Sequence, residues 1–196
     1  MEEVTFDGLQ LLSLPGRVMR PRATSEQLVD AACERIGSGA ARVVDVGTGG
    51  GAIAIAIALA CPRADVWATD ISRSAVPLAC ANVRRHGLAD RVHVRQGDLL
   101  APVAGLFDVI VANLPYVPAA TAADHPDLAD EPFDAVFAAG DGRTHYRRLV
   151  AAAATRLAVD GILLLQLDRR VMAASFAELP ALTAALGPPA VLRRAA

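Results

Sequence analysis

Short, uninterrupted apolar runs alternate with helical stretches along most of this chain. Strands are expected at residues 42–46, 66–69, 91–94, 107–112 and 162–167. Helices are expected at 24–36, 50–61, 72–86, 144–158 and 170–186, the first from a capping box that begins at Thr24. Strands that are mainly apolar, without regular alternation of polar residues, and that have helices between them are typical of a parallel sheet covered on both faces. The sequence therefore predicts an α/β fold with a doubly wound, mainly parallel sheet.

The length of 196 residues is enough for one substantial core. Residues 1–23 alternate apolar and polar character around Asp7-Gly8 and Pro15-Gly16, so we expect a leading segment or hairpin there. Residues 24–196 are then the main domain. Its last ten residues, 187–196, leave room for one further short strand, and Gly161 fits a turn into the strand at 162–167. We therefore expect the C-terminal edge of the sheet to be shortened.

The composition excludes several classes of function. The net charge of −2 gives no general affinity for nucleic acid. The longest apolar run, 52–61, is much shorter than the roughly 20 residues of a membrane span, and the acidic N-terminus does not resemble a signal peptide. Three cysteines and four histidines show no ligand spacing. We expect a cytoplasmic protein with no metal site, no disulfide and no membrane partner.

A glycine loop follows the strand at 42–46. Gly47, Gly49 and Gly51 allow a tight turn and a close approach of a ligand to the helix that follows. This signal is weak by itself, because Gly47-x-Gly49-x-x-Ala52 also satisfies the dinucleotide fingerprint and Asp70 has the spacing of its ribose-binding acid. A nicotinamide-dependent oxidoreductase is therefore one candidate.

Three further features favour S-adenosylmethionine as the cofactor. Asp45 directly precedes the loop and can meet the cofactor's amino group, and Gly97-Asp98 follows the third strand, where adenine would lie. Singly, Asp70 and Asp98 are as readily explained as helix caps or turn residues. Their occurrence at successive strand ends favours a ligand site.

The tetrapeptide Asn113-Leu114-Pro115-Tyr116 is the third feature, and it ends the fourth strand. An acceptor NH₂ group can donate hydrogen bonds to the Asn113 side-chain oxygen and to the Leu114 carbonyl, while the Tyr116 ring covers its flat face. Cofactor and amine would then meet at adjacent strand ends, where alignment is the main source of catalysis. The alternative is that the tetrapeptide is only a strand-terminating turn.

A long acidic segment follows this tetrapeptide. Residues 115–142 carry four prolines and the acids Asp124, Asp127, Asp130, Glu131 and Asp134. A loop of this length inside a compact domain is usually functional. We expect it to form a lid over the cleft.

These motifs resemble those of the HemK/PrmC-type protein glutamine-N5 methyltransferases. Members of this family methylate the glutamine of a Gly-Gly-Gln loop in translation release factors. Residues 18–29 are similar to the family segment that usually reads Pro-Arg-Pro-Glu-Thr-Glu. Glu131-Pro132, the run 139–142 and Tyr146-Arg147 are similar to its Glu-Pro, Gly-Gly-Asp-Gly and Tyr-Arg stretches. The likeness covers about residues 6–167.

The resemblance implies a Rossmann-like class I methyltransferase with a seven-strand-type sheet. It also implies S-adenosylmethionine as cofactor and S-adenosylhomocysteine as product. The residues implied for cofactor binding are Asp45, Gly47, Thr48, Gly49, Gly51, Asp70, Ile71, Asp98, Leu99 and Asn113. Those implied for catalysis are Asn113, Pro115 and Tyr116, and those for substrate binding are Asn113, Leu114, Pro115, Tyr116 and Glu131.

The chain departs from the family pattern at identifiable positions. Leu114 replaces the first proline of Asn-Pro-Pro-Tyr, as in ribosomal RNA adenine dimethyltransferases, and Gln166 stands where an acidic residue is usual. We expect the chain to lack the separate N-terminal helical domain of the bacterial enzymes, so that docking of a release factor would fall to the lid or to a helper subunit, or would not occur. Methylation of an exocyclic adenine nitrogen in RNA or DNA is the main alternative. A homologue that binds the cofactor without turnover is a further one.

Overall fold

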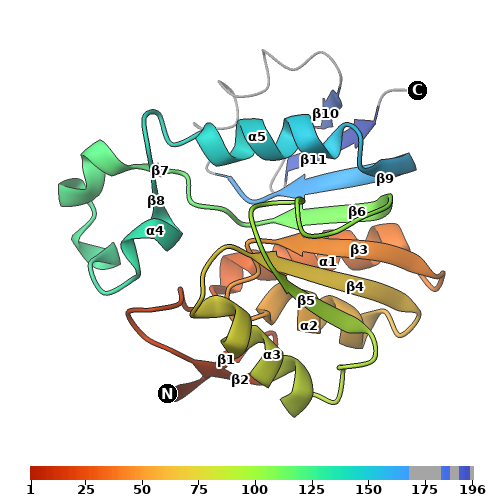
Figure 1. Cartoon of the computed structure of the whole chain (residues 1–196), viewed down its shortest axis with the longest axis horizontal. Helices are drawn as coiled ribbons and strands as arrows, with labels where there is room; N and C mark the ends of the chain where they lie inside the picture. Colours follow the sequence, from red (N-terminus) through yellow and green to blue (C-terminus); the bar gives the residue numbers. More distant parts are fainter. Residues whose placement is uncertain (168–181, 186–189, 195–196) are drawn as a thin grey trace.

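The computed structural model describes residues 1–167, 182–185 and 190–194 (Figure 1). Its strands are β1 Glu2–Phe6, β2 Leu9–Ser13, β3 Ala41–Val46, β4 Ala64–Asp70, β5 Val92–Gln96, β6 Phe107–Ala112, β7 Val117–Pro118, β8 Phe137–Ala138, β9 Leu157–Leu165, β10 Leu182–Ala185 and β11 Ala190–Arg194. Its α-helices are α1 Glu26–Ile36, α2 Ala52–Ala60, α3 Ala75–Arg85, α4 Phe133–Val136 and α5 Thr144–Ala153. Short 3₁₀ helices occur at η1 Ala23–Ser25, η2 Ala119–Asp124 and η3 Pro126–Leu128.

The central sheet has seven strands in the order β10-β11-β9-β6-β3-β4-β5. The five strands from β9 to β5 are parallel, and β11 and β10 continue the sheet in antiparallel pairing. The prediction of a doubly wound, mainly parallel α/β sheet is confirmed. The prediction of a shortened C-terminal edge is wrong, because two strands and not one complete that edge. The helix expected at 170–186 is wrong for 182–185, which form β10, and the remainder of that range lies outside the described residues.

Alternate residues of the same strands supply two separate cores. Val43 of β3 and Val109 of β6 pack with α1 and α2 on one face, whereas Val44 and Ile110 pack with α5 on the other. In Figure 1, α1 and α2 lie behind β3 and β4. Burial on both faces explains why these strands carry no polar alternation.

The elements before and at the start of β9 differ from their predicted limits. Helix α5 ends at Ala153, and β9 already begins at Leu157. Asp160 has a left-handed φ of 61°, and a Cβ on Gly161 would lie 2.9 Å from the carbonyl oxygen of Phe107. The pairing of β6 with β9 shifts register between Phe107 and Val109. Gly161 therefore serves an irregularity inside the strand, and the turn expected there is absent from the described chain.

The N-terminal strands β1 and β2 form an antiparallel hairpin. The segment 115–142 also has structure of its own, because it contains β7, η2, η3, α4 and β8, and β7 pairs with β8. Its small core consists of Leu128, Val136 and Phe137, and Met19 of the leading segment packs against it. The expectation of a plain loop was therefore wrong, and Figure 1 shows this lobe projecting from the sheet. No helix in the described part of the chain is long and apolar enough to cross a membrane.

Candidate active site

The carboxyl ends of three neighbouring parallel strands meet at one edge of the sheet. Strand β3 lies between β4 and β6, with Val46 paired to Thr69 on one side and to Ala112 on the other. The next residues along the three strands are Gly47, Asp70 and Asn113. The structure thus brings the start of the glycine loop, the acid after β4 and the tetrapeptide after β6 to a common edge, as ligand sites in open α/β sheets require.

Backbone hydrogen bonds hold the glycine loop in place. Gly47, Gly49 and Gly51 all have positive φ, at 75°, 57° and 86°. The N–H groups of Gly47 and Thr48 both donate to the Thr69 carbonyl, and that of Gly51 donates to the Thr48 carbonyl. These three N–H groups are therefore already engaged within the protein.

The loop also touches the tetrapeptide. A Cβ on Gly47 would lie 2.6 Å from Cδ2 of Leu114. Leu114 is only 6% exposed and belongs to the core between the sheet and α5. Its side chain is therefore a spacer between the two motifs and is turned away from solvent.

Asp45 lies beneath the loop with no exposed surface. Its Oδ2 accepts a hydrogen bond of 2.6 Å from the Thr48 hydroxyl, whereas Oδ1 is buried with no hydrogen bond to the described residues. Burial raises the pKa of Asp45 to about 7, against which hydrogen bonding from Thr48 works. One oxygen of the Asp45 carboxylate therefore has no hydrogen-bond partner among the described residues, and this carboxylate lies beside the turn where a ligand could bind.

Asp70 braces the loop from the end of β4. Its Oδ2 accepts a 2.8 Å hydrogen bond from the Gly49 N–H, and its Oδ1 accepts one of the same length from Ser72 N–H. Burial raises the pKa of Asp70, while the two backbone donors oppose that shift. Each carboxylate oxygen has a second lone pair, which leaves capacity for a ligand hydroxyl.

The residues predicted for the adenine end lie beyond Asp70. Ile71 is 70% exposed, an unusual exposure for a large apolar side chain. Leu99 has a left-handed φ of 48°, and its carbonyl accepts a hydrogen bond of 2.8 Å from the Thr69 hydroxyl. Asp98 is ion-paired with Arg148 of α5. Its carboxylate is thus already shared with a cation in this structure.

Asn113 and Leu114 are each fixed by a hydroxyl group from a different helix. Asn113 Nδ2 donates a 3.1 Å hydrogen bond to Oγ of Ser25, the residue that precedes α1. Leu114 N–H donates to the buried hydroxyl of Tyr146 on α5 at 2.9 Å. That hydroxyl also lies 3.0 Å from the Leu114 carbonyl oxygen and 2.7 Å from that of Gln166. Burial raises the pKa of Tyr146, so the phenol keeps its proton.

Tyr116 and Glu131 connect the tetrapeptide to the lobe at 115–142. A Cβ on Gly142 would lie 2.2 Å from the Tyr116 carbonyl oxygen, so the end of the lobe requires glycine there. Glu131 Oε2 accepts a hydrogen bond of 3.3 Å from the Arg20 N–H, and Oε1 lies 3.8 Å from the Arg22 guanidinium. Glu131 therefore ties the lobe to the leading segment.

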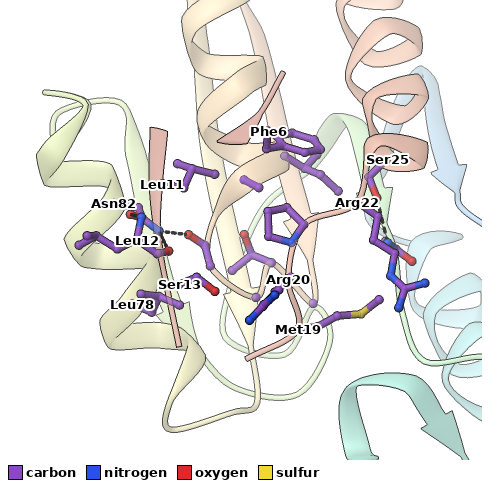
Figure 2. Close-up of a pocket in the computed structure, with 18 residues that line it drawn as sticks. Phe6, Leu11, Leu12, Ser13, Met19, Arg20, Arg22, Ser25, Leu78 and Asn82 are labelled. Atoms are coloured by element: carbon purple, nitrogen blue, oxygen red, sulfur yellow. Dashed lines mark hydrogen bonds between the residues drawn. The ribbon is translucent and has the colours of Figure 1, made fainter. Parts of the chain in front are cut away.

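A cavity lies between the glycine loop, the hairpin and the start of α1 (Figure 2). Figure 2 shows Leu12 and Ser13 on one side of it and Arg22 and Ser25 on the other. The predicted residues Gly47, Thr48, Gly49 and Asn113 line this cavity. The predicted residues Asp45, Gly51, Asp70, Ile71, Asp98, Leu99, Leu114, Pro115, Tyr116 and Glu131 are not among those that line it.

Sequence reasoning missed three residues that hold this edge together. They are Ser25, Tyr146 and Asn82. Asn82 is fully buried on α3; its amide bonds both the N–H and the carbonyl of Leu12 and also the carbonyl of Gly50. The sequence signal that could have identified Asn82 is a single asparagine on the apolar face of the helix expected at 72–86. The capping box predicted at Thr24 is not formed, because no side chain caps α1 and Thr24 accepts a hydrogen bond from Gln166 instead.

Comparison with known proteins gives a consistent picture. The family model of the methyltransferase small domain matches residues 23–135. A release factor glutamine methyltransferase of Gloeobacter violaceus is 44% identical over 81% of this chain, and a ribosomal protein uL3 glutamine methyltransferase of Bordetella pertussis is 39% identical over 83%. The chain spans 56% and 57% of the lengths of these relatives. A ribosomal protein L11 methylase of Lactobacillus delbrueckii superimposes with a TM-score of 0.64 at 24% identity, covering 89% of this chain and 79% of its own.

Proposed function

Because the chain belongs to the methyltransferase small domain family, we propose that it transfers a methyl group from S-adenosylmethionine to the side-chain amide of a protein glutamine. The observation that carries the proposal is the position of Asn113. Nδ2 of its amide donates a hydrogen bond to Ser25, and Asn113 lines the same cavity as the glycine loop. A planar amide held there lies beside the place where the loop receives a cofactor.

The charges around the loop support a cationic cofactor. Two carboxylates, Asp45 and Asp70, lie beneath and beside it, and the N–H of Gly49 is bonded to Asp70. The pyrophosphate of a dinucleotide needs free N–H groups and would be repelled by these acids. Bound S-adenosylmethionine supplies a methyl group on a positively charged sulfur, together with an ammonium group. The unsatisfied Oδ1 of Asp45 fits a ligand of that charge.

We assign the cofactor contacts along the strand edge. The cavity lined by Gly47, Thr48 and Gly49 receives the amino-acid end, and Asp45 and Gly51 support this turn from outside the cavity lining. Asp70 accepts from the ribose, and the exposed side chain of Ile71 covers the adenine together with Leu99. Asp98 contacts the adenine through its backbone, or through its side chain after the ion pair with Arg148 opens.

We assign the acceptor amide to the tetrapeptide. Asn113 Oδ1 and the Leu114 carbonyl accept its two N–H groups and fix its plane, and Tyr116 with Pro115 covers its face. Methyl transfer then forms an N–C bond as the S–C bond breaks, and one amide proton leaves to solvent. Alignment of this kind accounts for about 7 to 11 kcal/mol of a barrier.

Protein glutamine is favoured over an adenine base as the acceptor. Both curated relatives described above are named as glutamine methyltransferases of translation proteins. The lobe next to the site carries Asp124, Asp127, Asp130, Glu131 and Asp134, which would repel a nucleic acid backbone. Leu114 does not favour adenine, because its side chain is buried against Gly47. We propose a cytoplasmic translation factor as substrate, with residues 115–142 and a helper subunit as candidates for docking it.

Radiolabelled S-adenosylmethionine tests this function directly. The protein is incubated with a release factor, with the same factor carrying alanine in place of the glutamine of its Gly-Gly-Gln loop, with ribosomal protein and with RNA. Label is expected in the intact release factor or the ribosomal protein and is lost with the glutamine. Label found only in RNA would contradict the proposed acceptor. Binding of reduced nicotinamide dinucleotide with no binding of S-adenosylmethionine would contradict the cofactor.

A further inference from the structure

Four polar groups of the two residues that begin the tetrapeptide bear on the acceptor amide, two that donate hydrogen bonds and two that accept them. The donors are the Nδ2 group of Asn113 and the backbone N–H of Leu114. In the structure each donor is taken up by a hydroxyl oxygen, from Ser25 and from Tyr146. The acceptors are Asn113 Oδ1 and the Leu114 carbonyl oxygen. Asn113 Oδ1 has no hydrogen bond to any described residue, and the carbonyl is near the Tyr146 hydroxyl alone.

The Tyr146 hydroxyl has one proton for two nearby carbonyl oxygens. The Gln166 carbonyl lies at 2.7 Å and the Leu114 carbonyl at 3.0 Å. Because a phenol donates one hydrogen bond, donation to the nearer Gln166 oxygen leaves the Leu114 oxygen available. The same hydroxyl oxygen still accepts the Leu114 N–H. Tyr146 can therefore occupy the donor without consuming the acceptor.

Gln166 and Thr24 form a second pair in which a side-chain amide donates to a hydroxyl group. Gln166 follows β9, which neighbours β6 in the sheet, and its Nε2 donates a 3.0 Å hydrogen bond to the Thr24 hydroxyl. Two amide side chains at adjacent strand ends thus give their NH₂ groups to the consecutive hydroxyls of Thr24 and Ser25. The side-chain oxygen of Gln166 is buried and has no hydrogen bond to the described residues. One local turn, η1, therefore sets the orientation of both amides.

We propose that Ser25 and Tyr146 are positioning residues that hold the Asn113 NH₂ group and the Leu114 N–H, so that Asn113 Oδ1 and the Leu114 carbonyl oxygen meet the group that is methylated. This inference rests on the proposed function. An asparagine amide can rotate by half a turn and present either its oxygen or its NH₂ group. An NH₂ group facing the cleft would reject an acceptor amide, because two donors would then meet. Ser25 thereby selects for a substrate that donates hydrogen bonds.

The matched variants Ser25→Ala and Ser25→Thr test the role of the hydroxyl. Ser25→Ala is expected to lower kcat for methylation of a release factor by about ten- to a hundredfold, in line with the sensitivity of transfer rates to small misplacements. The dissociation constant for S-adenosylmethionine, measured by calorimetry, should change by less than about twofold. Ser25→Thr keeps the hydroxyl and should recover most of the rate. Tyr146→Phe should lower kcat in the same direction but also lower Tm, because it leaves buried polar groups unpaired.

A double-mutant cycle separates orientation from general support of the fold. In Asn113→Asp both side-chain atoms are oxygens, so rotation no longer matters. Ser25→Ala should therefore reduce kcat by a smaller factor in that background than in the wild type.

The outcomes distinguish the inference from the function on which it rests. Wild-type protein that methylates a glutamine, with Ser25→Ala equally fast, would overturn the inference alone. Equal loss in Ser25→Thr and Ser25→Ala would do the same, even where Asn113→Asp is too slow to measure. Wild-type protein that methylates no protein glutamine would overturn the proposed function and remove the inference with it.

Discussion

The two halves of the site are built from different chemistry. The half at the ends of β3 and β4 consists of carboxylates, Asp45 and Asp70, that accept hydrogen bonds from the surrounding backbone and from Thr48. The half at the end of β6 consists of an amide and a peptide group whose N–H donors are capped by Ser25 and Tyr146. A buried carboxylate favours a cation, and an uncharged oxygen favours a neutral N–H donor. The difference matches a sulfonium donor on one side and an amide acceptor on the other.

Asn113→Ala should have the largest effect of these variants, and it acts on the acceptor half of the site. Removal of the side-chain oxygen leaves the acceptor amide held by one contact, and kcat is expected to fall by at least about a hundredfold. Binding of S-adenosylmethionine, measured by calorimetry, should remain within a few-fold of wild type. Unchanged methylation by this variant would remove the tetrapeptide from the mechanism.

Asn82→Ala is the matched control on the other half. Asn82 ties the hairpin to the glycine loop through Leu12 and Gly50 and does not reach the tetrapeptide. Its loss leaves buried backbone groups unpaired, so Tm should fall and the dissociation constant for S-adenosylmethionine should rise. At saturating cofactor, kcat should change much less than in Asn113→Ala. The reverse ranking would contradict the division of the site into two halves.

Asp45→Asn should stabilise the folded protein in a pH-dependent way. Burial raises the pKa of Asp45 from an ordinary 3.8 to about 7. Between these values the folded protein holds a proton that the unfolded chain has released, so this group lowers the free energy of unfolding as pH rises from 4 to 7. The variant should therefore be more stable than wild type above pH 7, and the difference should disappear below about pH 4. Denaturant titrations across this range measure it.

The same substitution should act oppositely on cofactor binding. Ionised Asp45 attracts the positive charge of S-adenosylmethionine, and the neutral amide does not. Wild-type affinity is expected to rise with pH through about 7, the pKa of Asp45, while the affinity of Asp45→Asn stays low, about tenfold weaker, and flat. A pH-independent wild-type affinity would show that Asp45 has only a structural role.

The sequence predicted the carboxylate half better than the amide half. The loop glycines, Asp45 and Asp70 are close in sequence and follow recognisable strand ends, so periodicity and spacing place them together. Ser25 and Tyr146 are 88 and 32 residues away from their partners in the tetrapeptide. Contacts over such separations depend on how α1 and α5 dock on the sheet, which no local pattern encodes.

Other differences between prediction and structure have local causes. The position of the Leu114 side chain was not predicted: it packs against Gly47, where a Cβ would lie 2.6 Å from its Cδ2. The start of β9 was missed because Asp160 and Gly161 resemble a turn although they form an irregularity within a strand. The shortened sheet edge was expected because residues 187–196 leave room for one short strand, which is β11. The edge is longer because residues 182–185, expected to be helical, form β10 and pair with β11.

Leu114→Pro should have a moderate effect, and it tests whether Leu114 influences the choice of acceptor. Proline removes the N–H that donates to Tyr146 and part of the contact with Gly47, so the free energy of unfolding should fall by about 1 to 3 kcal/mol. The choice between protein and RNA should not change, because the side chain is 6% exposed and faces the core. Methylation assays of the variant on release factor and on RNA check this. A switch in acceptor would show that Leu114 is read directly.

Glu131→Gln should have the smallest effect, on the lobe at residues 115–142. Its ion pair with Arg22 is 3.8 Å long and the arginine side chain is 42% exposed, so the pair contributes less than about 1 kcal/mol. The hydrogen bond from Arg20 N–H to Oε2 can be kept by the glutamine oxygen. KM for the protein acceptor should rise by about two- to threefold, with kcat and cofactor affinity unchanged, if the lobe positions the acceptor. A rise in the dissociation constant of S-adenosylmethionine instead would assign the lobe to the carboxylate half, because Arg20 and Arg22 line the cavity beside the glycine loop.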